Sequence, residues 1–82
     1  MVAPLSEVIA IVRYLLHDDD LDVTSTTRFD DLANWDSMDL VTLVTEAECR
    51  YGLRFDPLEI DRVITAGDLV HMIEGKQALA SA

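Results

Sequence analysis

Apolar side chains recur every three or four residues between positions 4 and 16, which is the spacing of one face of an α-helix. They are Leu5, Val8, Ile9, Val12, Leu15 and Leu16. Pro4 suits the first turn, because the amide that proline lacks has no partner at that position in a helix. The pattern therefore predicts a first helix over residues 4–16.

The helical periodicity disappears between His17 and Asn34. Aspartate occupies four of the five positions from 18 to 22, where like charges would repel one another in a helix. Residues 24–27 are all serine or threonine, which favours a loop or a strand. A loop of this length is uncommon in a compact domain unless it is anchored. We expect its anchors to be its apolar residues, namely Leu21, Val23, Phe29 and Leu32.

A second amphipathic segment covers residues 36–51. Its apolar stripe consists of Leu40, Leu43, Val44, Ala47 and Tyr51. Gly52 follows directly and can adopt the left-handed conformation that ends many helices. We therefore predict a second helix that ends at Gly52.

Two more helices are expected in the remaining chain. Asp56-Pro57 has the order of an N-cap residue and a first-turn proline, which predicts a short third helix. The segment from Thr65 to Asp68 has the outline of a capping box for a fourth helix. Gly75 would end that helix and leave the tail from Lys76 frayed. The expected buried residues are Leu58, Ile60 and Val63 in the third helix, and Ala66, Leu69, Val70 and Ile73 in the fourth.

The predicted fold is all-α, because no segment shows the alternating pattern of a strand. We expect a small antiparallel four-helix bundle of three main helices and one short helix, with a long first loop. No repeat or linker divides the chain, so a single domain over residues 1–82 is expected, as a monomer.

Size and charge exclude several classes of function. A chain of 82 residues has little room for both a core and a cleft that encloses a substrate, so an enzyme is not expected. Six basic and sixteen acidic residues give a net charge of −10, which disfavours a nucleic-acid partner and favours partners with basic surfaces. The apolar runs are too interrupted for a membrane span, and no basic region precedes an apolar block as in a signal peptide. We therefore expect a cytoplasmic protein.

Metal and disulfide chemistry find little support in the sequence. Cys49 is the only cysteine, which excludes an internal disulfide and cysteine-type metal sites. The alternate aspartates from position 18 begin like a calcium loop, but Val23 and Phe29 stand where that loop needs glycine and glutamate. His17 and His71 have no partner at a ligand spacing, so we expect surface positions for them and no metal site.

The start of the second helix is the most informative segment. Asp36 at the N-cap and Asp39 three residues later have capping-box spacing, with an acid in each role. Trp35 and Leu40 occupy the two positions of a hydrophobic staple. Ser37 is then the first helical residue, with its hydroxyl outside the hydrogen-bonded ladder of the helix.

Ser37 has two interpretations at this position. It can simply be part of the cap, where serine and aspartate are common. It can also carry a group, because a phosphate attached to it would lie at the positive end of the helix dipole. Ser37 precedes Val44 by seven residues, almost two turns, so a long arm attached there can swing outward or lie along the core.

The run Trp35-Asp36-Ser37-Met38-Asp39-Leu40-Val41 resembles the Asp-Ser-Leu signature of acyl carrier proteins. The acidity, the long first loop and the helix order are similar to that family along nearly the whole chain. The resemblance implies that Ser37 accepts 4′-phosphopantetheine from coenzyme A, transferred by a Mg²⁺-dependent phosphopantetheinyl transferase. It also implies that Asp36 helps to orient this step and the metal. The thiol of the arm would then hold an acyl or aminoacyl group as a thioester, and the protein itself would catalyse nothing.

The second helix departs from the family pattern, in which its exposed face is richer in acids. Acids remain at Asp39, Glu46 and Glu48. Met38 and Val41 flank the buried stripe, where they either form a small apolar contact patch or are ordinary core residues. We expect these five residues to bind partners, namely loading and downstream biosynthetic enzymes with basic docking surfaces. The dilution of acids favours a dedicated biosynthetic pathway over a general role in fatty-acid synthesis.

Two alternatives stay open at this point. The chain can be an aminoacyl or peptidyl carrier, which shares the fold and the serine and differs only in the enzyme that loads it. It can also be a carrier-like interaction module that never receives the arm.

Overall fold

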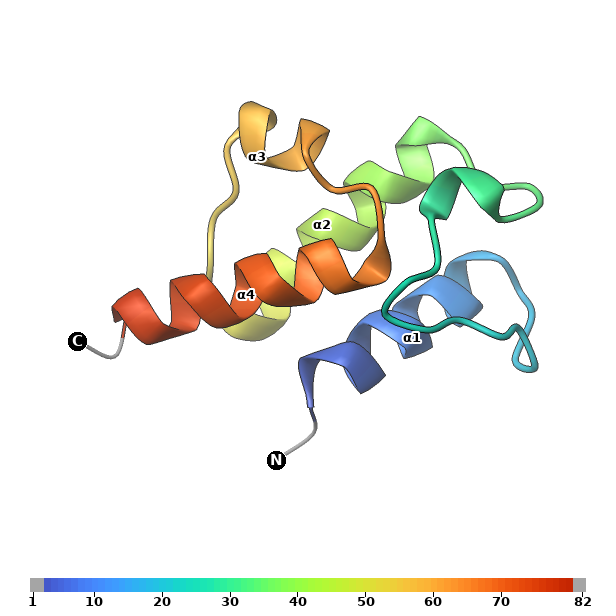
Figure 1. Ribbon diagram of the computed structural model, residues 1–82, viewed down its shortest axis with the longest axis horizontal. Coiled ribbons are helices and arrows are strands. Elements are labelled where there is room, and N and C mark those ends of the chain that lie inside the picture. The colour runs from blue at the N-terminus through green and yellow to red at the C-terminus, as the bar shows by residue number, and fades with distance from the viewer. Residues whose placement is uncertain (1–2, 81–82) are drawn as a thin grey trace.

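The computed structural model describes residues 3–80 and contains four α-helices (Figure 1). They are α1 (Pro4–Leu15), α2 (Ser37–Tyr51), α3 (Pro57–Asp61) and α4 (Ala66–Ala80), and the first loop contains one 3₁₀ turn, η1 (Phe29–Asp31). Within the described part no strand occurs, only an isolated β-bridge between Arg28 and Thr65. The predicted all-α fold, with three main helices, a short helix and a long first loop, is confirmed.

The three long helices pack around one apolar core. α1 contacts both α2 and α4, while α3 lies apart from α1 and above α4 in the view of Figure 1. Glu7 near the start of α1 pairs with Arg50 near the end of α2, so these two helices run antiparallel. The core residues are Val8, Ile11, Val12, Val23, Phe29, Leu43, Val44, Ala47, Phe55, Val63, Ala66, Leu69 and Ile73. None of the helices in residues 3–80 is long and apolar enough to cross a membrane.

The first loop is anchored by its apolar residues, as predicted. Val23 and Phe29 are buried, and Leu21 and Leu32 pack against the core. Backbone hydrogen bonds also fasten the loop to the chain before and within the first turn of α4. The Phe29 amide donates to the Ile64 carbonyl at 3.0 Å, and the Gly67 amide donates to the Ser25 carbonyl at 2.8 Å. The turn η1 was not predicted, because three residues are too few to show a periodic pattern.

The helix ends agree with four of the predicted caps, one of which is Asp56 as the N-cap of α3. Asp36 is the N-cap of α2, and Gly52 after its last residue is left-handed, with φ of 65°. At the start of α4, the Asp68 amide donates to Thr65 Oγ1 at 3.1 Å, and the Thr65 amide donates to Asp68 Oδ2 at 3.0 Å. These side chains satisfy amides that helix geometry leaves without a partner.

Helix α3 begins at Pro57 as predicted, but Leu58 is not buried. Its side chain is 72% exposed, whereas Ile60 packs against the core and Val63 is buried. Residues two apart in an α-helix lie about 200° apart around its axis. Leu58 and Ile60 therefore lie on nearly opposite sides of α3, and only one of them can face the core.

Helix α4 continues through Gly75 to Ala80, so the predicted stop at Gly75 and the frayed tail from Lys76 are wrong for the described residues. A glycine inside a helix costs about 1 kcal/mol relative to alanine. This cost is offset by Lys76, whose Nζ lies 2.9 Å from a Glu59 carboxylate oxygen and 5.2 Å from the centroid of the Phe55 ring. Neither contact can be seen in the local sequence around Gly75.

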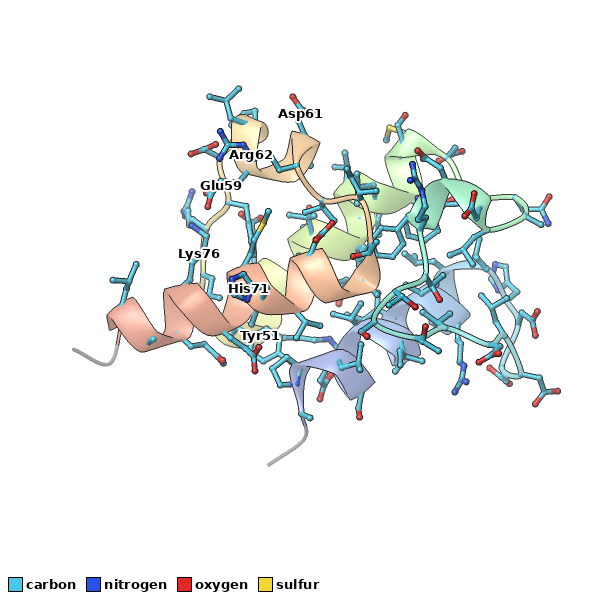
Figure 2. The ribbon with its side chains drawn as sticks, in the orientation of Figure 1. Tyr51, Glu59, Asp61, Arg62, His71 and Lys76 are labelled. Carbon is cyan, nitrogen blue, oxygen red and sulfur yellow. The ribbon has the colours of Figure 1, made fainter. Side chains whose placement is uncertain are left out.

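Helix α3 packs less closely against the other helices than they pack against one another. Polar contacts therefore contribute much of what holds α3 in place. Figure 2 shows Lys76 of α4 directed towards Glu59 of α3. Just before α3, the Phe55 amide donates to a Glu48 carboxylate oxygen of α2 at 2.8 Å. The hydrogen bond from the Asp56 amide, followed by that from Lys76, lowers the pKa of Glu59 below its ordinary value of 4.5.

The two helical glycines of α4 should respond in opposite ways to alanine. A Cβ atom at Gly67 would lie 2.6 Å from the Ser25 carbonyl oxygen, whereas one at Gly75 would meet nothing within 4 Å. We expect Gly67→Ala to lower the free energy of unfolding by about 1–3 kcal/mol, and Gly75→Ala to raise it by roughly 0.5–1 kcal/mol. Urea unfolding of both variants checks this, and equal effects would contradict the close contact between the first loop and α4.

The contribution of Glu59 should depend on pH. Its folded-state pKa lies below 4.5, so its stabilising effect is present above that pH and is lost as the pH falls through the lower folded value. We expect Glu59→Gln to lower the melting temperature at neutral pH, and the difference from the wild type to shrink as the pH falls below 4.5. Glu74→Gln, at an exposed position of α4, is the matched control for loss of one charge. A difference for Glu59→Gln that does not change with pH would contradict this assignment.

Candidate functional site

The start of α2 is fixed by a reciprocal pair of hydrogen bonds. The Asp39 amide donates to Asp36 Oδ1 at 3.0 Å, and the Asp36 amide donates to Asp39 Oδ2 at 3.1 Å. The Asp36 backbone is extended, so the chain changes from loop to helix between Asp36 and Ser37. The predicted capping box, with an acid in each role, is confirmed.

Ser37 is exposed and stands at the edge of a groove of about 280 Å³. The first loop, the start of α2, and α3 with the residues that follow it all contribute to this groove. Trp35 and Leu40, the two positions of the predicted staple, both line it. The Trp35 ring is stacked on the buried Phe29, with ring centroids 5.0 Å apart. The groove therefore has an apolar wall beside the Ser37 hydroxyl.

These residues fit a covalently attached phosphate group. The amides of Ser37 and Met38 lie in the first turn of α2, where helix geometry provides no carbonyl partner and the helix dipole is positive. The hydroxyl of Ser37 is on the surface, within reach of a modifying enzyme, and the adjoining groove has room for part of an arm. Ser37 is thus accessible to an enzyme from solvent, and the groove next to it can hold part of an attached arm.

The charge around Ser37 is negative. Asp30, Asp36 and Asp61 are among the residues that line the same groove. They would repel a freely diffusing anion, so a phosphate at Ser37 must be held by its covalent bond and not by charge attraction. In residues 3–80, no group of three histidine, cysteine, aspartate or glutamate side chains is arranged to hold a metal ion.

The five residues that were expected to bind partners differ in their exposure and in their contacts within the chain. Met38 and Val41 are exposed by 68% and 47%, which makes Val41 a surface residue and not part of the core. Asp39 is engaged in the capping box. Glu46 is exposed and lies 3.8 Å from the Arg50 guanidinium one turn later. These four residues all remain accessible at least in part.

Glu48 differs from the expectation that it lies on the exposed face of α2. It is half-buried, and its carboxylate accepts the hydrogen bond from the Phe55 amide. The reason is that the chain turns back at Gly52 and places Phe55 beside the flank of α2 that carries Glu48. Glu48 therefore stabilises the connection between α2 and α3.

Sequence reasoning did not identify the far side of the groove. Ile60, Asp61 and Ile64 line it from α3 and the residues after it, more than twenty positions after Ser37. Asp30, in η1, was also missed. No local spacing relates these residues to Ser37, because only the tertiary fold brings α3 and η1 to the groove at the start of α2.

Comparisons with known proteins agree with this geometry. Residues 6–73 match the family model described as phosphopantetheine attachment site. The acyl carrier protein of Thermotoga maritima is 35% identical over 71 residues, which cover 87% of this chain and 88% of that protein. The solution structure of the holo acyl carrier protein from Geobacter metallireducens superposes with a TM-score of 0.82 at 26% identity, covering 96% of this chain and 91% of that one.

The family model matches most of the chain, and the alignment with the Thermotoga relative also covers most of it. The fold agrees with that of a carrier protein in its holo form. This chain therefore belongs to the acyl carrier protein family, and it is a carrier with covalently attached phosphopantetheine and not an enzyme.

Proposed function

We propose that Ser37 is the residue that bears 4′-phosphopantetheine, and that the chain is a stand-alone carrier of an acyl intermediate in a dedicated biosynthetic pathway. The observation that carries the assignment is the position of Ser37, exposed on the first turn of α2 and at the edge of the apolar groove. The hydroxyl is accessible to a transferase, and an attached arm can either extend into solvent or lie in the groove.

The chemistry at Ser37 takes place in trans. When a phosphopantetheinyl transferase acts with Mg²⁺ and coenzyme A, Ser37 Oγ forms a bond to phosphorus and loses its proton, and the nucleotide part of coenzyme A leaves. Asp36 has two roles in this proposal. Its Oδ1 accepts the Asp39 amide, and the carboxylate also stands next to Ser37, where it can help to position the Mg²⁺ ion.

The thiol of the arm would hold its cargo as a thioester. The apolar wall of Phe29, Trp35 and Leu40 favours an acyl group with an apolar body, which loses contact with water when it lies in the groove. Loading and downstream enzymes would approach at the start of α2, where Met38 and Val41 are exposed. The small number of acids on the outer face of α2 supports partners specific to one pathway.

An aminoacyl cargo is the second candidate, and one observation favours it. Asp30 and Asp61 line the groove together with Asp36, so an ammonium group on the cargo would be attracted to its rim. The loading enzyme distinguishes these two classes of carrier, since both use the same serine.

Ser37 should be the single site of modification. We expect wild-type protein treated with coenzyme A, Mg²⁺ and a broad-specificity phosphopantetheinyl transferase to gain the mass of one phosphopantetheine. Ser37→Ala should gain nothing and should unfold at nearly the same temperature, because the side chain is exposed and the cap is made by its neighbours. Intact mass and peptide mapping check both statements. Modification at another serine, or none on the wild type, would refute the proposal.

Two substitutions separate the roles of Asp36. Asparagine caps helices about as well as aspartate, whereas alanine costs about 1 kcal/mol. We expect Asp36→Ala to lower both the free energy of unfolding and the rate of arm transfer. Asp36→Asn should keep the stability and still slow the transfer by about tenfold, as for residues that support a metal site. If Asp36→Asn transfers the arm at the wild-type rate, the carboxylate acts only as a cap.

A further inference from the structure

Trp35 places an aromatic ring beside the proposed attachment residue. It is the only tryptophan of the chain, and it directly precedes the N-cap Asp36. Its indole is stacked on the Phe29 ring, with centroids 5.0 Å apart and an angle of 14° between the ring planes. Phe29 is only 2% exposed, so it cannot move away without opening the core. The indole therefore rests on a fixed support.

The backbone on both sides of Trp35 is also held in place. The chain turns between Leu32 and Trp35, where the Trp35 amide donates to the Leu32 carbonyl at 3.3 Å. Asn34, the third residue of this turn, is left-handed, with φ of 67°. Turns with a left-handed third residue favour glycine or asparagine at that position. Asp36 follows and begins the capping box of α2. Trp35 is thus fixed between a closed turn and a helix cap.

The groove that Trp35 lines has room for a ring. Its volume is about 280 Å³, whereas a cavity of about 150 Å³ is enough to hold a benzene molecule. Leu40, Ile60 and Val63 are further apolar members of its lining. A cyclic acyl group on an arm that folds back from Ser37 would therefore meet apolar surface from the first loop, α2 and α3. A groove of this size suits a short or cyclic acyl group better than a long alkyl chain.

Two features of the lining select among such groups. Because Phe29 covers one face of the indole, Trp35 meets the groove with its other face or its edge. An aromatic ring gains from either arrangement, since ring quadrupoles favour offset stacking and edge-to-face contact, whereas a saturated ring gains only the burial of its area. Asp30, Asp36 and Asp61 also line the groove, so a carboxylate on the cargo would be repelled.

We infer that the cargo of this carrier is an aromatic acyl group without a carboxylate, and that Trp35 is the residue that selects it. The inference rests on the proposed attachment at Ser37, and it narrows the class of apolar acyl groups proposed above. The ring of the cargo packs against the indole and so adds a third ring to the pair that Phe29 and Trp35 form. This contact draws the thioester towards the groove and reduces its exposure to water.

Two acyl groups with the same number of carbons test the inference. A broad-specificity phosphopantetheinyl transferase with Mg²⁺ and either benzoyl-coenzyme A or cyclohexanecarbonyl-coenzyme A loads the whole acyl arm onto Ser37, and intact mass confirms the loading. The readout is the rate of thioester hydrolysis on the carrier, divided by the rate for the same acyl-pantetheine free in solution. This ratio removes the intrinsic reactivity of each thioester. Burial of area alone favours the saturated ring, which has the larger apolar surface, so the order of the two groups is decisive.

We expect the benzoyl thioester to be protected about threefold more strongly than the cyclohexanecarbonyl thioester on the wild type. Trp35→Leu keeps an apolar side chain and should abolish this difference. Trp35→Phe keeps an aromatic ring and should retain the preference. Tyr14→Leu is the matched control, because it removes a ring that is 76% exposed on α1 and lies outside the groove. It should behave as the wild type.

Stronger protection of the saturated ring, or equal protection of both, would overturn the inference and leave a groove that accepts apolar acyl groups in general. So would an aromatic preference that persists in Trp35→Leu. If circular dichroism shows that Trp35→Leu does not fold, the wild type and Trp35→Phe still decide the question. Failure of the wild type to accept any arm overturns the proposed function itself, which is a different result.

Discussion

The reciprocal hydrogen bonds between Asp36 and Asp39 are the constraint on which the site depends. They fix the residue at which the loop becomes helix, and therefore place Ser37 at the first helical position with its hydroxyl on the surface. Trp35, immediately before the cap, is brought onto Phe29 at the groove. A shift of the helix start by one residue would rotate Ser37 by about 100° around the axis of α2. The groove would then adjoin a different side chain.

The acidic residues at the helix starts form hydrogen bonds within the chain. Asp36 and Asp39 cap α2, Asp56 and Glu59 form the corresponding box at α3, and Asp68 accepts amides before α4. Hydrogen bonds from the backbone are the largest cause of the lowered pKa of Asp68. Part of the large negative charge is therefore a consequence of how α2, α3 and α4 begin. It is not, residue by residue, a measure of attraction to partners.

One side of the groove beside Ser37 is formed by α3, which buries little apolar surface. α3 buries no residue within its bounds, and Leu58 faces solvent. Its position relies on Lys76, which reaches it from a turn of α4 beyond Gly75. The continuation of α4 is thus connected to the shape of the site, although the two lie far apart in the sequence. Polar contacts of this kind are weaker than a packed core and are sensitive to pH.

Local patterns in the sequence determined the four helices and most of their ends, and they indicated Ser37 as the residue proposed to bear the arm. The stripe of α2, the glycine after it and the spacing of Asp36 and Asp39 are all short-range features, because caps and amphipathic faces act over a few residues. Tertiary structure decided the rest. It carried α4 past Gly75 through contacts with Glu59 and Phe55, and it turned Glu48 inward to bind the amide of Phe55. It also assembled the groove from α3 and η1, since residues far apart in the chain meet only when the helices pack.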